Sequence, residues 1–117
     1  MDDADARLVE TTMELLGGKW KVLILWHIGV AGMCRFGELR RKLPGITQRT
    51  LTLQLRELET SGLVHRTVYA EVPPRTEYRQ TEAAKNLTGI YMELKQWSLA
   101  HRELLDAHME RNSRRLN

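Results

Sequence analysis

The sequence predicts a mainly α-helical domain that carries one small β-hairpin. Three observations lead to this prediction. Two helical segments, at about residues 36–43 and 48–61, are joined by the short turn 44–46, which contains a glycine. A hairpin-like segment, 63–80, follows them directly. Further helices with apolar faces lie before and after this unit. A three-residue turn between two helices is the spacing of a helix-turn-helix, so with the hairpin as its wing we expect a winged helix-turn-helix.

Length and composition favour a single globular domain over the 117 residues. The longest apolar run, Val22–Trp26, is far too short to span a bilayer, and the acidic N-terminus lacks the basic and apolar regions of a signal peptide. We therefore expect a cytoplasmic protein. The expected parts are N-terminal helices at about 6–28, a helix-turn-helix at 36–61, a wing at 63–80 and C-terminal dimerisation helices at 82–110.

The N-terminal helices are predicted from the spacing of their apolar side chains. Residues 6–16 place apolar side chains on one helical face, and the glycine pair 17–18 ends this helix. Residues 19–28 are apolar on nearly every side, which is typical of a central buried helix. A short strand is expected at 33–35, where Cys34 would be an inert core thiol.

The second helix of the helix-turn-helix is predicted to have an inward and an outward face. Thr47 is the expected N-cap, because its hydroxyl can accept a backbone N–H of the first turn. Leu51, Leu55 and Leu58 fall within a narrow sector at about 100° per residue, so this sector packs inward. The opposite side presents polar and cationic side chains and one exposed leucine.

The outward face offers groups that suit base edges. Arginine pairs with guanine, glutamine suits adenine, and methyl-bearing side chains touch the thymine methyl group. The side chains assigned to base edges are Gln48, Arg49, Thr52, Leu53 and Arg56. Arg56 could instead reach a phosphate. The alternative for the whole segment is a plain surface helix with a core seam.

Positive charge is concentrated around the helix-turn-helix. Residues 35–56 contain six bases and one acid, whereas residues 1–16 contain one base and five acids. Such a patch suits a polyanion, because lysine and arginine displace counterions from phosphates. A solvated face is the alternative, and bases at the end of a helix also compensate its dipole. The side chains expected at phosphates or in the wing are Arg40, Arg41, Lys42, Thr47 and Arg75.

The wing is predicted as two strands, 63–70 and 75–80, on either side of the break at 71–74. Two prolines in this break fix their φ angles, so a stiff loop could hold Arg75 near a minor groove or a phosphate at small entropic cost. A hairpin turn with an incidental arginine is the alternative.

The C-terminal region is predicted to be helical, capped by Thr81, bent near Ser98, extending to about residue 110 and frayed after Arg111. Its apolar stripe is long for a domain of this size. We therefore expect the stripe to pair with a symmetry mate and with the first helix, although packing on its own subunit is the alternative. The side chains expected at this dimer interface are Leu8, Leu87, Ile90, Tyr91, Leu94 and Trp97. Aromatic residues near it could line a pocket for a small-molecule effector of unidentified class.

Several short motifs occur in a fixed order along the chain. They are Leu16-Gly17-Gly18-Lys19-Trp20, Arg35-Phe36-Gly37-Glu38-Leu39, Pro44-Gly45-Ile46-Thr47-Gln48-Arg49, Leu55-Arg56-Glu57-Leu58-Glu59, Gly62-Leu63-Val64, Val72-Pro73-Pro74-Arg75 and Glu77-Tyr78. Over about residues 8–97, this ordered set resembles the HxlR-type (DUF24) transcription regulators, relatives of the MarR group. The resemblance implies a winged helix-turn-helix homodimer that makes its dimer contacts through N-terminal and C-terminal helices and binds palindromic operators.

One feature of the resembled family is missing. Many members have a Cys-Pro pair shortly before the first helix, and in several that cysteine senses oxidants, quinones or aldehydes. The corresponding positions here are Arg7 and Leu8, so the sensing cysteine is absent. Cys34 lies elsewhere, and the resemblance assigns it no such role.

The sequence shows no enzymatic motif: it has no phosphate loop, no Gly-x-Ser-x-Gly elbow and no Cys/His nucleophile pair. We therefore expect no enzyme activity. His101 and His108 lie seven residues apart and make a poor metal site, so we expect no metal or cofactor either. The predicted function is that of a transcription regulator that binds double-stranded DNA sequence-specifically, with repression favoured and activation as the alternative outcome. The alternative is a winged-helix module that binds a protein partner and no DNA, whose affinity would depend less steeply on salt.

Overall fold

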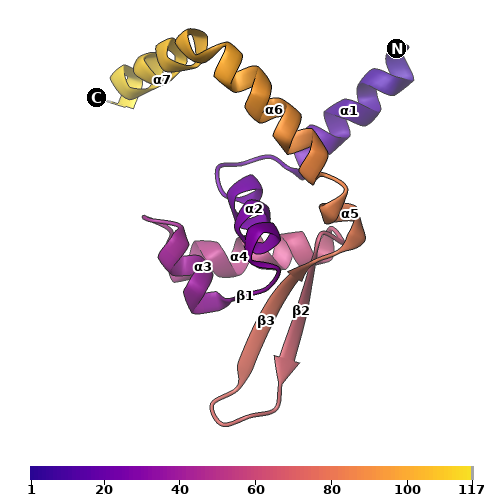
Figure 1. The fold of residues 1–117 in the computed structure, drawn as a ribbon, viewed down its shortest axis with the longest axis vertical. Coiled ribbons are helices and arrows are strands. Elements are labelled where there is room, and N and C mark those ends of the chain that lie inside the picture. Colours follow the sequence, from indigo (N-terminus) through magenta and orange to yellow (C-terminus); the bar gives the residue numbers. More distant parts are fainter. Residues whose placement is uncertain (117) are drawn as a thin grey trace. The chain divides into compact units, whose positions relative to one another are not determined.

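The structure is a computed structural model that describes residues 1–116, and the chain divides into two compact units, Met1–Lys85 and the residues from Asn86 onward (Figure 1). The elements of the first unit are α1 (Asp3–Leu15), α2 (Lys21–Ala31), β1 (Cys34–Arg35), α3 (Phe36–Lys42), α4 (Gln48–Thr60), β2 (Val64–Tyr69), β3 (Arg75–Gln80) and α5 (Glu82–Lys85). The second unit contains α6 (Thr88–Ala100) and α7 (Arg102–Leu116). This mainly helical fold with a small antiparallel sheet confirms the predicted winged helix-turn-helix class.

The sheet has the order β1-β3-β2, so β3 is its central strand. Both pairings are antiparallel, with Cys34 opposite Tyr78 and Thr67 opposite Glu77. The short strand expected at 33–35 therefore exists and extends the predicted hairpin to three strands. In Figure 1 the β2–β3 hairpin projects away from the helices of its unit, as a wing does.

The core of the first unit lies between α2, α3, α4 and the sheet. Its fully buried side chains include Ile24, Leu25, Ile28, Leu39, Leu51, Leu58 and Cys34. The expectation that α2 is buried on nearly every side was wrong. Only one face of α2 is buried, while Val22, Leu23, Trp26 and Val30 on its other faces are between 37% and 70% exposed.

A side-chain hydrogen bond ties the sheet to α2. The Gln80 Nε2 at the end of β3 donates to the carbonyl oxygen of Leu25 at 2.9 Å. The amide lies against Gly29, where a Cβ atom would come within 2.8 Å of Gln80 Nε2. A glycine at this point of α2 thus allows the close approach that fixes the base of the wing against the helices.

The first helix begins earlier than the apolar pattern predicted. Asp2 accepts the backbone N–H of Asp5 at 2.9 Å, and Asp5 accepts that of Asp2 at 3.1 Å. This reciprocal capping box satisfies two amides that would otherwise lack partners, so α1 starts at Asp3 and not near residue 6.

The C-terminal region differs from its prediction in where it breaks and where it ends. Thr81 does act as a cap, since its hydroxyl accepts the N–H of Ala84 at 3.3 Å, but the capped helix α5 is a single turn. The break between α6 and α7 falls at His101, whose ring stacks on Trp97 with 4.4 Å between ring centroids. The tail expected to fray after Arg111 is helical to Leu116.

The burial pattern of α4 leads to a stability prediction. Leu51→Ala removes a side chain that is 0% exposed and leaves a cavity, so we expect the free energy of unfolding to fall by about 2–5 kcal/mol. Leu53→Ala removes a side chain that is 52% exposed on the same helix, so the free energy of unfolding should change by less than about 0.5 kcal/mol. Urea unfolding followed by circular dichroism at one protein concentration measures both. Equal losses would contradict the assignment of the two faces.

Candidate nucleic-acid interface

The turn between α3 and α4 is held from both sides, which fixes the angle at which α4 leaves it. Leu43 and Ile46 are 2% and 6% exposed and anchor the turn in the core. The Ile46 N–H donates to the Leu43 carbonyl at 3.1 Å, and Gly45 takes a φ of 88°, which an L side chain rarely adopts. Thr47 then caps α4 as predicted, because its hydroxyl accepts the Thr50 N–H at 3.1 Å.

The two faces of α4 lie as the sequence predicted. Leu51, Leu55 and Leu58 are at most 2% exposed. The outward residues Gln48, Arg49, Leu53 and Arg56 are all exposed. Thr52 is half-buried, and its hydroxyl donates to the Gln48 carbonyl at 2.8 Å, which leaves the hydroxyl lone pairs and the methyl group for an outside partner.

The cations of this surface are free of internal ion pairs. Within residues 1–116, no carboxylate lies within ion-pair distance of five exposed cations in α3 and α4, namely Arg40, Arg41, Lys42, Arg49 and Arg56. Nearby cations do pair: Lys21 lies 2.7 Å from Glu57, and Arg66 lies 3.0 Å from Glu59. The five cations therefore present their whole charge to whatever approaches this surface.

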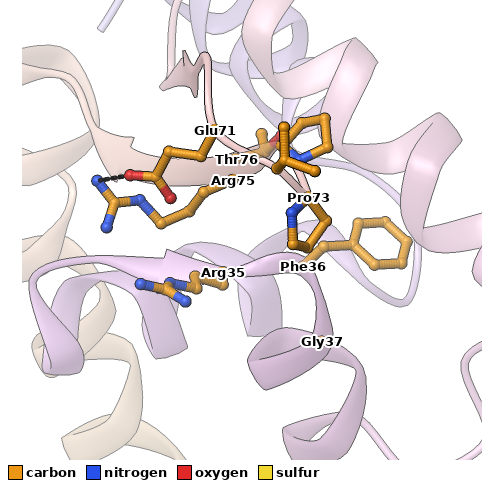
Figure 2. A pocket seen from close by; sticks show the side chains of 9 residues that line it. Arg35, Phe36, Gly37, Glu71, Pro73, Arg75 and Thr76 are labelled. Atoms are coloured by element: carbon orange, nitrogen blue, oxygen red, sulfur yellow. Dashed lines mark ion pairs between the residues drawn. The ribbon is translucent and has the colours of Figure 1, made fainter.

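The wing loop lies against the start of α3. Figure 2 shows Pro73 close to Phe36 at the edge of an open cleft of about 410 Å³, which the loop residues share with Arg35 and Gly37. Val72 is fully exposed at the tip of the loop. The wing loop and the start of the helix-turn-helix thus line the same cleft.

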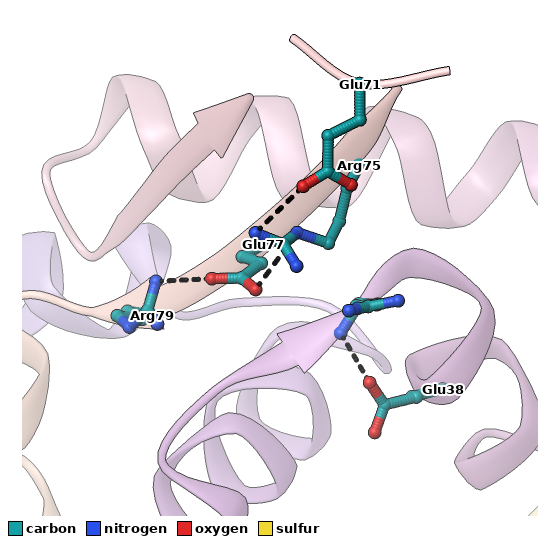
Figure 3. Close-up of polar contacts among 6 residues, drawn as sticks. Glu38, Glu71, Arg75, Glu77 and Arg79 are labelled. Atoms are coloured by element: carbon teal, nitrogen blue, oxygen red, sulfur yellow. Dashed lines mark hydrogen bonds and ion pairs between the residues drawn. The ribbon is translucent and has the colours of Figure 1, made fainter. Parts of the chain in front are cut away.

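Arg75 lies where the sequence predicted it, at the start of the second strand of the wing. It is the first residue of β3, beside the loop, and its side chain is 30% exposed. Its Nη2 lies 3.4 Å from Glu71 and its Nε lies 3.5 Å from Glu77 (Figure 3). Its guanidinium also lies over the Tyr69 ring, 4.2 Å from the ring centroid. These contacts restrain the Arg75 guanidinium, and part of the side chain stays accessible.

Glu77 and Arg79 complete this cluster, and neither was among the site residues predicted from the sequence. Glu77 pairs with Arg79 Nη1 at 3.0 Å. Burial raises the pKa of Glu77, but the hydrogen bonds and charges of its neighbours, Arg79 first, bring that pKa below its usual value. The sequence held a signal for the cluster: positions 75, 77 and 79 alternate along one strand, so their side chains share one face of the sheet.

The side chains expected at a dimer interface are mostly exposed in each unit. In α1, Leu8 is 69% exposed, and no residue of that helix is buried. In the second unit, Ile90, Leu94 and Trp97 are 55%, 54% and 48% exposed, while Leu87 and Tyr91 are half-buried.

Cys34 is buried as the sequence predicted. It is 0% exposed, its Sγ lies 3.7 Å from the His27 carbonyl oxygen, and burial raises the pKa of the thiol. A buried thiol with a raised pKa forms little thiolate, which is the reactive species. Among the described residues, no group of three or more His, Cys, Asp or Glu side chains could hold a metal ion, and no helix is long and apolar enough to cross a membrane.

Comparison with known proteins agrees with this geometry. The family model described as HxlR-like helix-turn-helix matches residues 15–106. The uncharacterized HTH-type transcriptional regulator YybR of Bacillus subtilis (strain 168) is 48% identical over 100 residues, which are 86% of this chain and 79% of that protein. The regulator YdeP of the same organism is 46% identical over 105 residues, which are 90% of this chain and 81% of that protein.

Solved structures share the fold. The redox regulator HypR in its reduced form gives a TM-score of 0.78 at 48% identity, over 85% of this chain and 97% of that one. A transcriptional regulator of the MarR family from Enterococcus faecalis V583 gives a TM-score of 0.76 at 36% identity, over 92% of this chain and 94% of that one. The chain therefore belongs to the HxlR-like helix-turn-helix family, whose members are transcription regulators that bind DNA and not enzymes.

Proposed function

We propose that this protein is a cytoplasmic repressor that binds a palindromic operator as a homodimer and reads base edges in the major groove with α4. The observation behind this proposal is the contrast between the two faces of α4. Its leucines anchor it in the core, and its outward arginines, Arg49 and Arg56, have no carboxylate partner within residues 1–116. In this proposal Gln48, Arg49, Thr52, Leu53 and Arg56 meet base edges.

Phosphate contacts are proposed for the cations that end α3 and for the start of α4. Arg40, Arg41 and Lys42 are exposed and follow each other at the C-terminal end of α3. Contacts of this kind position a protein on the duplex and supply affinity without sequence information. Thr47 precedes the first turn of α4, and Arg75 lies beside the wing loop; both are proposed to approach the same backbone.

Homodimer formation is supported by the apolar surface that each unit exposes. A monomer rarely exposes contiguous apolar patches of more than a few hundred Å². Here α1 exposes Leu8 and α6 exposes Ile90, Leu94 and Trp97. Two-fold symmetry would also double the number of base contacts, since one recognition helix reads only a few base pairs.

The assigned roles of α4 and α3 predict different effects of two substitutions. Arg49→Ala should relax base preference and weaken operator binding by about 1–3 kcal/mol, because a bidentate base contact is lost. Lys42→Ala should weaken all duplexes alike and reduce the slope of log K against log salt concentration by about 0.9. Fluorescence anisotropy with selected and random duplexes measures both effects. Indistinguishable effects of the two variants on base preference would contradict the assignment.

The operator proposal predicts the outcome of selection from random duplex DNA. The recovered sites should be palindromic, with half-sites about 34–36 Å apart, or a multiple of that, because the two recognition helices enter successive turns of one groove face. Sequencing of the bound pool measures symmetry and spacing together. Enriched sites with a single, unrepeated half-site would rule out the symmetric dimer, and a pool without enrichment would favour the alternative of a protein-binding module.

The dimer proposal predicts the effect of a charge in α6. Leu94→Glu places a carboxylate on a side chain that is 54% exposed in the protomer and buried in the proposed interface, so the sedimentation coefficient should fall from that of a dimer to that of a monomer. The control variant Val68→Glu introduces the same charge at a wing residue that is also 54% exposed. This variant should remain dimeric. A wild-type monomer at micromolar concentration would contradict the proposal.

A further inference from the structure

The wing contains a buried carboxylate. Glu77 is 6% exposed and is the one charged residue that is buried within residues 1–116. It lies between Thr76 and Tyr78 on the central strand, and since Tyr78 faces the core, the side chain of Glu77 lies on the opposite face of the sheet. Burying a carboxylate is costly unless it is paired, and apolar residues of similar size serve stability equally well. A role outside stability would account for this residue.

The neighbours of Glu77 form a chain of contacts that ends at the wing loop. Arg79 holds one carboxylate oxygen at 3.0 Å, and the other oxygen lies 3.5 Å from Arg75 Nε (Figure 3). Glu71 and the Tyr69 ring restrain the same guanidinium from the loop and from β2. Glu77 thus links a fixed point on the sheet to the arginine that lies next to the loop.

This restraint has a consequence for binding. An arginine side chain that is free before binding loses rotamer entropy when a contact immobilises it. Arg75 is already restrained by ion pairs of 3.4 Å with Glu71 and 3.5 Å with Glu77 and by the Tyr69 ring, its Nε is buried without a hydrogen-bond partner, and 30% of its side chain is exposed. It can therefore meet an anion at a lower entropic cost than the unpaired arginines of α3 and α4.

We propose that Glu77 is a positioning residue for DNA binding, which orients Arg75 beside the wing loop for contact with a backbone phosphate. This inference rests on the proposed function, in which the wing approaches DNA. Glu77 has two opposite effects on an approaching polyanion: it orients a cation, and it adds one negative charge. The sign of its net effect on binding separates positioning from plain electrostatics.

The test compares Glu77→Gln, Arg75→Gln and the double variant in the full chain, with a random-sequence duplex titrated at several salt concentrations. Glu77→Gln should bind several-fold more weakly than the wild type although it is more positive, and its slope of log K against log salt should shrink by up to about 0.9. The double variant should bind like Arg75→Gln alone, because Glu77 acts through Arg75. Glu82→Gln, the same change at an exposed residue of α5, should bind at least as tightly as the wild type.

The outcomes separate the possible roles of Glu77. Tighter binding by Glu77→Gln would overturn the proposal in favour of plain electrostatics. A double variant much weaker than Arg75→Gln would overturn it in favour of a structural role. If a thermal melt shows that Glu77→Gln does not fold, Glu77→Asp replaces it in the test, because it keeps the charge on a shorter side chain that reaches Arg75 less well. Its slope of log K against log salt should lie between that of the wild type and that of Arg75→Gln. An Asp variant that folds and binds like the wild type would overturn the proposal. Wild-type protein that binds no duplex would refute the proposed function, whereas wild-type binding that is insensitive to Arg75→Gln would refute this inference alone.

Discussion

The candidate nucleic-acid interface depends on three leucines that hold α4 against the core. Leu51, Leu55 and Leu58 occupy one narrow sector of the helix and are all but inaccessible to solvent. Burial of each contributes about 1.5–3 kcal/mol relative to an exposed side chain. A rotation of α4 by one residue, about 100°, would remove these side chains from the core and turn polar and charged side chains toward it. The same hydrophobic contact that stabilises the fold therefore fixes which side chains face outward.

Two sets of arginines in the first unit differ in how they are paired. Those of α3 and α4, such as Arg49 and Arg56, are exposed and have no ion-pair partner within residues 1–116, so their attraction for a polyanion is undiminished. Those of the wing, Arg75 and Arg79, both pair with the carboxylate of Glu77. Unpaired positive charge is concentrated where the helix-turn-helix would meet the duplex, whereas the two wing arginines are restrained by a shared carboxylate.

The sequence was most informative where one local signal was enough. The Thr47 cap and the leucine spacing predicted the start and the orientation of α4. The β-branched and aromatic residues before the prolines predicted β2, and the proline break predicted where β3 begins, because these features depend on near neighbours in the chain. The start of α1 was misplaced because the capping box of Asp2 and Asp5 lies outside the apolar pattern that was used. The end of α7 was misplaced because its last turns are polar, with an ion pair between Arg114 and Glu110 at 3.5 Å and no apolar periodicity.

Two properties could not be predicted because they depend on contacts distant in sequence or outside the protomer. Charged residues at positions 75, 77 and 79 also occur in strands whose charged face is solvated. Glu77 is buried only because β3 is the central strand, paired with β1 on one side and β2 on the other. The apolar surface of α2 suggested burial on all sides, but periodicity does not tell whether an apolar face meets the protein's own core or another molecule.

The first helix shows why folding and operator binding would be coupled in the proposed dimer. An isolated helix of fewer than about 12–15 residues is marginal in water, and most helical stability in proteins comes from packing of an apolar face. α1 has 13 residues, none of which is buried in the protomer, and Leu8, Val9 and Met13 are more than half exposed. Its capping box contributes about 1 kcal/mol, which does not replace a packed face. A second copy that covers these side chains would stabilise α1 and bring two recognition helices together in one step, so the affinity of each subunit for DNA would depend on the concentration at which the apolar surfaces find each other.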